Sequence, residues 1–126
     1  RHARLLGVLP RDELRERMGQ AAIFAHPARY EPFGLAPLEA GLAGCALVLG
    51  DLPSLREVWG DAAAYVTPGD AEALADRLQG LIAEPDRRAD LGCRARVRAR
   101  RYGAASMARA YAGTYARLRA REAQLA

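Results

Sequence analysis

Short apolar runs alternate with longer amphipathic stretches along most of this chain of 126 residues. A run of four or five apolar residues between glycine, proline or polar positions predicts a buried strand, and apolar residues spaced by three and four predict a helix. Strands are therefore expected at residues 5–9, 22–26, 46–49 and 63–66. Helices are expected at residues 11–18 and 35–42, from Ser54 onward, and at residues 70–84, 86–103 and 104–122.

The order of these elements, strands and helices in alternation and then three helices, is typical of a parallel α/β sheet. Both faces of such a sheet are normally covered by helices, so we predict a Rossmann-like α/β fold in three layers. The length suits one domain. Because the chain starts at Arg1 instead of Met, and four short strands make a thin sheet, we expect residues 1–126 to be one partial domain of a longer protein.

Two polar residues mark expected helix starts. Ser54, with Glu57 three positions later, has the spacing of a capping box. Asp70 is expected to cap the next helix, in which four apolar residues share one face: Leu74, Leu78, Leu81 and Ile82. The last helix carries an apolar stripe that we expect either to pack on the core or to reach toward another domain: Met107, Tyr111, Thr114 and Leu118.

The turn between the strand at residues 22–26 and the following helix is the most informative stretch. Pro37 lacks an N–H group and must lie in the first turn of that helix, which places the helix start near Gly34. The N–H groups of Gly34, Leu35 and Ala36 are then unpaired donors at the positive end of the helix dipole. Such a helix start binds phosphate or diphosphate well, and a glycine allows close approach of the ligand.

Two carboxylates bracket this turn. Glu39 lies about one turn inside the helix and could accept two hydrogen bonds from a vicinal diol such as that of a ribose. Glu31 precedes the turn and could accept hydroxyl groups from another part of the ligand. A nucleotide sugar has these groups in this order. For the pair of glutamates alone, the simpler interpretation is a capping carboxylate and a solvent-facing one.

The stretch His26-Pro27-Ala28-Arg29-Tyr30-Glu31-Pro32-Phe33-Gly34-Leu35-Ala36-Pro37-Leu38-Glu39-Ala40 resembles the Glu-x7-Glu motif of retaining GT-B glycosyltransferases of family 4, also called group 1. Residues 51–58 and 63–70 resemble the segments that follow this motif, especially in mannosyltransferase-like members. The resemblance implies the C-terminal, donor-binding domain of a GT-B enzyme of polysaccharide biosynthesis. The N-terminal domain, which binds a carbohydrate or lipid-linked acceptor, and the first strands of this domain would precede Arg1.

The resemblance also implies roles for single residues. Glu31 matches the first, catalytic glutamate near the hydroxyls of the donor sugar, and Glu39 matches the second, on the ribose. Phe33, Gly34 and Leu35 match the segment whose backbone binds the sugar and the phosphate. Ala36 follows directly and is included in this predicted sugar- and phosphate-binding segment. Gly7 and Val8 resemble the pair near the nucleobase.

The family reaction transfers the sugar with retention at the anomeric carbon, by front-face displacement, without a cofactor or an obligatory metal. The arginine and lysine that clamp the diphosphate would lie upstream of Arg1, so we expect this chain alone to be inactive. Where the family often has two glycines, this chain has Leu52 and Pro53.

The charge pattern adds less. All nineteen basic residues are arginine and the net charge is +4, which is compatible with anionic ligands. The arginine-rich helix at residues 94–101 is interpreted as solvated, or less favourably as a contact to an anionic membrane; nucleic acid is not expected, since no recognition motif accompanies the charge. Cys45 and Cys93 lack metal-ligand spacing and fit a reducing cytoplasm, so we expect a cytoplasmic protein. In the alternative with a membrane contact, the protein would lie at the inner face of the membrane.

Alternatives remain at this point. His26 could be a proton donor or a phosphate ligand, although a hydrogen-bonded structural histidine is the preferred interpretation. The whole chain could be a non-catalytic nucleotide-binding or interaction module, or part of a sugar-nucleotide epimerase on the same scaffold.

Overall fold

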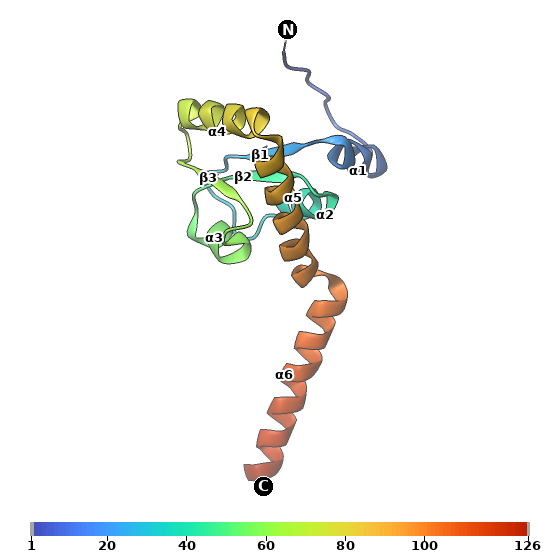
Figure 1. Cartoon of the computed structure of the whole chain (residues 1–126). Coiled ribbons are helices and arrows are strands. Elements are labelled where there is room, and N and C mark those ends of the chain that lie inside the picture. The colour runs from blue at the N-terminus through green and yellow to red at the C-terminus, as the bar shows by residue number, and fades with distance from the viewer. Residues whose placement is uncertain (1, 126) are drawn as a thin grey trace.

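The structure is a computed structural model and describes residues 2–125 (Figure 1). The strands are β1 (Ile23–His26), β2 (Ala46–Gly50) and β3 (Ala64–Val66). The α-helices are α1 (Arg11–Gln20), α2 (Leu35–Ala43), α3 (Pro53–Trp59), α4 (Ala71–Ala83), α5 (Pro85–Ala99) and α6 (Ala104–Leu125), and the short 3-10 helix η1 (Arg100–Tyr102) joins the last two.

The three strands form one parallel sheet in the order β1-β2-β3. In the register, Ala25 pairs with Val48, and Leu49 pairs with Tyr65. All five residues of the central strand β2 are buried, as expected for a parallel strand covered on both faces. The predicted α/β fold with a parallel sheet is therefore confirmed for three of the four expected strands.

Side chains of β2 alternate between two apolar layers because successive residues of a strand point to opposite faces. Leu47 and Leu49 pack with Met18, Leu55 and Trp59 in a core between the sheet and helices α1, α2 and α3. On the other face, Ala46 and Val48 pack with Val66, Leu81 and Leu91, which brings α4 and α5 to the sheet. Ile82 lies outside this second layer and is 63% exposed, so the apolar face of α4 is narrower than predicted.

The strand expected at residues 5–9 is not formed. Leu5 and Val8 are fully exposed, at 99% and 101%, and no described segment pairs with this stretch. Gly7 has a φ of 65°, which breaks the extended backbone that a strand needs. The apolar run predicted a strand, but strand formation depends on a neighbouring strand, and none lies beside residues 5–9 in the described chain.

The start of α3 also differs from the prediction. The helix begins at Pro53, whose fixed φ suits the first helical position, and Leu52 is the N-cap residue. Ser54 is therefore inside the helix, and its hydroxyl donates a hydrogen bond to the main-chain oxygen of Glu31 at 2.5 Å. By contrast, the predicted cap of α4 is confirmed, because Oδ1 of Asp70 accepts from the N–H of Ala73 at 2.9 Å.

Arginines of α5 bind the C-terminal ends of three other helices. A helix ends in carbonyl groups without intrahelical partners, at the negative end of its dipole, where a guanidinium is favourable. The donors and their acceptor carbonyls are Arg88 to Leu81 and Ile82 of α4 at 3.0 and 3.1 Å, Arg96 to Ala43 of α2 at 2.8 Å, and Arg98 to Val58 and Glu57 of α3 at 2.6 and 3.0 Å. Within residues 94–101, Arg96 stays exposed as expected for a solvated helix, and Arg96 and Arg98 also bind the ends of neighbouring helices.

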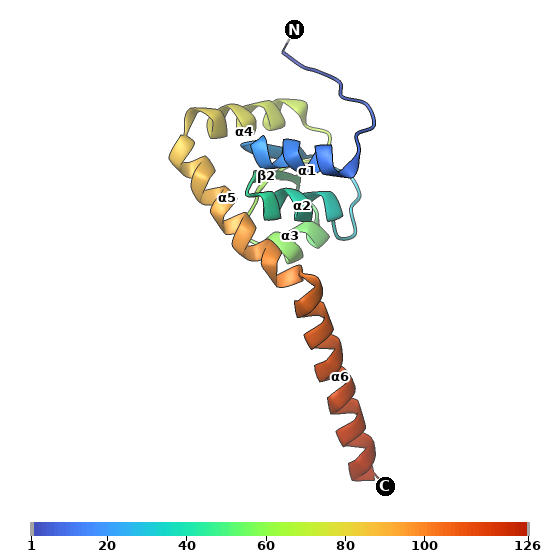
Figure 2. The ribbon, with the colours of Figure 1, turned by 90° about the vertical axis from the view of Figure 1, so that its right-hand side faces the viewer.

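Helix α6 leaves the body after η1 and extends away from it in both views (Figures 1 and 2). Its predicted stripe does not pack on the core: Met107 is 58% exposed, Tyr111 57% and Leu118 53%. The alternative, contact with another domain, stays a prediction. No helix within residues 2–125 has the length and apolar character needed to cross a membrane.

Candidate functional site

The turn that follows β1 has the backbone predicted from Pro37. Helix α2 begins at Leu35, so Pro37 is its third residue, within the first turn. Gly34 is the N-cap residue, with φ 89° and ψ 75° in the left-handed region, which glycine adopts without steric cost. The carbonyl of Gly34 accepts the first helical bond, from the N–H of Leu38 at 3.0 Å.

Three N–H groups remain free at this helix start. In the described part of the chain, no hydrogen bond uses the N–H of Gly34, Leu35 or Ala36, and no side chain caps the helix. No acidic residue lies in the first turn of α2. Leu35 is 71% exposed and Ala36 is exposed, so solvent or a ligand can reach this end of the helix. The three predicted donors are thus unpaired, and Leu35 and Ala36 are exposed, whereas Gly34 is buried.

Phe33 differs from these neighbours. Its N–H already donates to Oε1 of Glu31 at 3.3 Å, so it is not a free donor. Its ring contacts Tyr102 edge to face, with centroids 5.5 Å apart, and packs against the core around Trp59. In this structure Phe33 anchors the turn on the body of the protein, and its predicted ligand contact stays a prediction.

Glu31 is held by three contacts. Oε1 accepts from Phe33, its main-chain oxygen accepts from Ser54, and Oε2 lies 3.4 Å from Nε2 of His26. The side chain retains 25% exposure, and each carboxylate oxygen has two lone pairs, so acceptor sites remain for a ligand. The turn therefore fixes the orientation of this carboxylate before any ligand binds.

His26, at the end of β1, does not make the expected hydrogen bond. Its Nε2 is buried and has no hydrogen-bond partner within residues 2–125, although the separation from Glu31 is within ion-pair distance. The two atoms are close but are not aligned for a hydrogen bond. The ring is parallel to that of Phe24 within 19°, with centroids 6.2 Å apart.

Glu39 lies on the side of α2 that faces α1. Its carboxylate is 40% exposed and lies 3.8 Å from the guanidinium of Arg11. It lines a surface hollow of about 240 Å³ together with Arg15, Met18 and Leu42. Gly7 and Val8 lie in the exposed stretch before α1, and no described contact brings them to the turn. The structure thus places Glu31 and the free donors in one turn, and Glu39 one helical turn further in.

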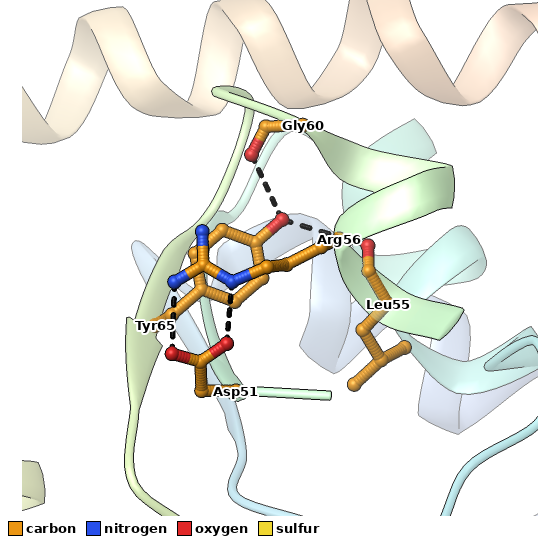
Figure 3. Close-up of polar contacts among 5 residues, drawn as sticks. All are labelled: Asp51, Leu55, Arg56, Gly60 and Tyr65. Carbon is orange, nitrogen blue, oxygen red and sulfur yellow. Dashed lines mark hydrogen bonds and ion pairs between the residues drawn. The ribbon is translucent and has the colours of Figure 1, made fainter. Parts of the chain in front are cut away.

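A second polar cluster, at the carboxyl end of β2, was not anticipated from the sequence (Figure 3). Arg56 binds both carboxylate oxygens of Asp51, and its guanidinium lies 4.3 Å from the ring centre of Tyr65. The hydroxyl of Tyr65 donates to the carbonyl of Gly60 at 2.8 Å. The hydrogen bonds from Arg56 lower the pKa of Asp51, and burial raises the pKa of Tyr65. Arg56 is therefore already paired with a carboxylate inside this second cluster.

Comparison with known proteins decides the family. The sequence matches the family described as Glycosyl transferases group 1 over residues 1–98. The chain belongs to the group 1 glycosyltransferases. It is 33% identical over 99 residues to the alpha-maltose-1-phosphate synthase of Mycolicibacterium smegmatis, covering 72% of this chain and 26% of the relative.

Two further relatives of this group 1 chain are named as mannosyltransferases. The O-antigen chain mannosyltransferase B of Escherichia coli is 40% identical over 79 residues, covering 62% of this chain and 21% of the relative. The phosphatidyl-myo-inositol mannosyltransferase of Mycolicibacterium smegmatis is 35% identical over 104 residues, covering 80% and 27%. The chain thus spans about a quarter of the length of the curated relatives it matches.

The fold comparison agrees with the family. The sucrose-phosphate synthase of Thermosynechococcus elongatus matches with a TM-score of 0.80 and 27% sequence identity, covering 91% of this chain and 30% of that one. The predicted membership of the GT-B glycosyltransferases is confirmed. Within residues 2–125, no three His, Cys, Asp or Glu side chains gather as metal ligands, and the metal-free reaction stays a prediction.

Proposed function

We propose that this chain is the donor-binding part of a retaining glycosyltransferase that uses a nucleoside diphosphate sugar. One observation carries the proposal: the free N–H groups of Gly34, Leu35 and Ala36 share one turn with Glu31, a carboxylate already fixed in orientation. The N–H groups suit a diphosphate, because they are unpaired donors at the positive end of a helix dipole. The carboxylate suits neutral hydroxyl groups, which donate to it.

In this proposal each part of the donor has its own contact. The diphosphate binds at the start of α2, and hydroxyls of the sugar donate to Glu31. The two ribose hydroxyls donate to Glu39, whose carboxylate is accessible beside the hollow on the α1 side. Gly7 and Val8 would contact the nucleobase only after residues 5–9 leave their exposed position.

The proposed reaction is front-face displacement with retention. The bond between the anomeric carbon and the β-phosphate oxygen breaks, and the acceptor oxygen forms its bond on the same face of the sugar. The acceptor proton passes to the leaving diphosphate. Free N–H groups at the start of α2 would stabilise the charge that develops on the diphosphate, because they are oriented before the reaction. No metal or cofactor is assigned to this step, and the cationic clamp would come from residues preceding Arg1.

The names of two relatives support a narrower version of the proposal. O-antigen chain mannosyltransferase and phosphatidyl-myo-inositol mannosyltransferase name mannosyl transfer, to a glycan chain in one case and a lipid in the other. We therefore propose a hexosyl donor and a carbohydrate or lipid-linked acceptor, with the reaction in the cytoplasm and, for a lipid acceptor, at the inner face of the membrane.

A calorimetric donor screen tests the proposal in the full-length protein that contains this chain. Nucleoside diphosphate sugars are titrated beside the corresponding nucleoside diphosphates. Glu39→Gln is expected to weaken both ligand types by about 1–3 kcal/mol, the size of a lost charge-assisted hydrogen bond. The control is Glu122→Gln, an exposed glutamate on α6. Absence of binding by every donor, or unchanged affinity in Glu39→Gln, would contradict the proposed site.

A further inference from the structure

His26 and Glu31 face each other across the turn, and we infer that His26 is a positioning residue for the sugar-binding carboxylate. Nε2 of His26 lies 3.4 Å from Oε2 of Glu31, while the other carboxylate oxygen accepts from the backbone of Phe33. His26 thus restricts the second oxygen, the one that the turn itself leaves free to rotate. The inference rests on the proposed function, since it concerns the contact between Glu31 and the donor sugar.

The imidazole is itself held by the sheet. His26 and Phe24 are two positions apart on β1 and therefore point to the same face. Their rings stack, with centroids 6.2 Å apart and planes inclined by 19°. Phe24 in turn packs against the core. The ring of His26 consequently has a defined plane, and packing that does not depend on a ligand holds its Nε2 within 3.4 Å of the carboxylate.

The effect on a sugar must pass through Glu31. Nε2 is buried and so does not reach a ligand directly, and within the described chain Glu31 is the acidic group paired with it. A proton on Nε2 makes the contact attractive, whereas a bare nitrogen would set a lone pair against a carboxylate oxygen. A small rotation of the glutamate would align the hydrogen bond and satisfy the buried nitrogen. A buried nitrogen without a hydrogen-bond partner costs free energy. The folded site is therefore stabilised when the carboxylate of Glu31 lies where it accepts from Nε2.

Two substitutions at His26 distinguish the effect of the N–H group at Nε2 from the effect of the volume of the ring. His26→Gln keeps an amide N–H that can reach the place of Nε2, whereas His26→Leu keeps apolar volume and removes the donor. His2→Leu, at an exposed histidine, is the matched control. Each variant is made in the full-length protein, alone and with Glu31→Gln, and is titrated with a nucleoside diphosphate sugar and with the nucleoside diphosphate. Circular dichroism melting confirms that each variant folds.

His26→Leu is expected to weaken the sugar-bearing ligand by about tenfold and the nucleoside diphosphate by less than about twofold. His26→Gln is expected to restore most of the sugar affinity. In the Glu31→Gln background, His26→Leu is expected to have no further effect, because the two residues act through one carboxylate. Equal losses for both ligands, or an undiminished loss in the Glu31→Gln background, would overturn the inference while leaving the donor site intact.

A ligand-free measurement keeps this inference distinct from the proposed function. The same four-variant cycle, His26→Leu and Glu31→Gln singly and together, is followed by urea unfolding. Non-additive free energies of unfolding are expected for residues in contact. If no donor binds the wild type, the proposed function fails and the role in sugar binding falls with it, whereas additive unfolding energies would overturn the His26–Glu31 contact itself.

Discussion

The hydroxyl of Ser54 donates a hydrogen bond of 2.5 Å to the main-chain oxygen of Glu31. This bond joins the first turn of α3 to the turn that carries the candidate carboxylate, although the two residues are 23 positions apart. The loop after β1 is thereby fixed by an element that follows β2. Adjacent parallel strands end at the same edge of a sheet, which makes such a contact between their following segments possible.

Removal of this bond should loosen the turn more than it harms the fold. Ser54→Ala leaves a half-buried carbonyl without its partner, so we expect the free energy of unfolding to fall by about 1 kcal/mol. Donor affinity should fall as well, because Glu31 loses one of its three restraints. Urea unfolding and calorimetry measure the two effects. Ser54→Thr, which keeps the hydroxyl, should retain both, and a Thr variant as weak as the Ala variant would contradict this role.

Gly34 is required for the shape of the helix start. Its φ of 89° is strained for any residue with a Cβ, and a Cβ there would lie 3.0 Å from Cγ of Pro37. Gly34→Ala should therefore lower the free energy of unfolding by about 1–2 kcal/mol. Gly80→Ala, in the interior of α4 with open space around its Cα, should instead raise it by about 0.5–1 kcal/mol. Denaturant titrations of both variants measure the two free energies of unfolding. Equal changes at both positions would contradict the requirement for glycine at position 34.

Local sequence signals predicted the elements that depend on neighbouring residues. Pro37 located the start of α2, and Asp70 located the cap of α4, because both act within one helical turn. The strand predicted at residues 5–9 is wrong, because a strand needs a hydrogen-bonded partner strand that local sequence does not reveal. Neither His26 nor Glu31 has a local sequence feature that predicts their contact. Asp51 and Arg56 are five positions apart across a loop and a helix start, and this spacing is only a weak signal of their pairing.

The arginine-rich helix shows the same limit. Arg98 reaches carbonyls 40 and 41 positions earlier in the chain, and only the fold brings the end of α3 to it. Arg98→Gln should lower the free energy of unfolding by about 1–3 kcal/mol, because two carbonyls at the negative end of a helix lose a charged donor. Arg119→Gln, at an exposed position of α6, should change it by less than about 0.5 kcal/mol. Thermal and urea unfolding compare the two, and similar losses would argue against the cap.

The Asp51–Arg56 pair predicts a dependence of stability on pH. Its hydrogen bonds lower the pKa of Asp51 in the folded state, so the pair stabilises the fold above the ordinary aspartate pKa of about 3.9. That contribution is lost as the pH falls through the lowered folded pKa, because the unfolded chain binds the proton first. The difference in free energy of unfolding between the wild type and Asp51→Asn should therefore shrink as the pH falls below about 4. It should also shrink with added salt, since both side chains are about half exposed. Asp76→Asn, at an exposed aspartate of α4, is the control, and a difference that stays constant across the acid range would contradict the pairing.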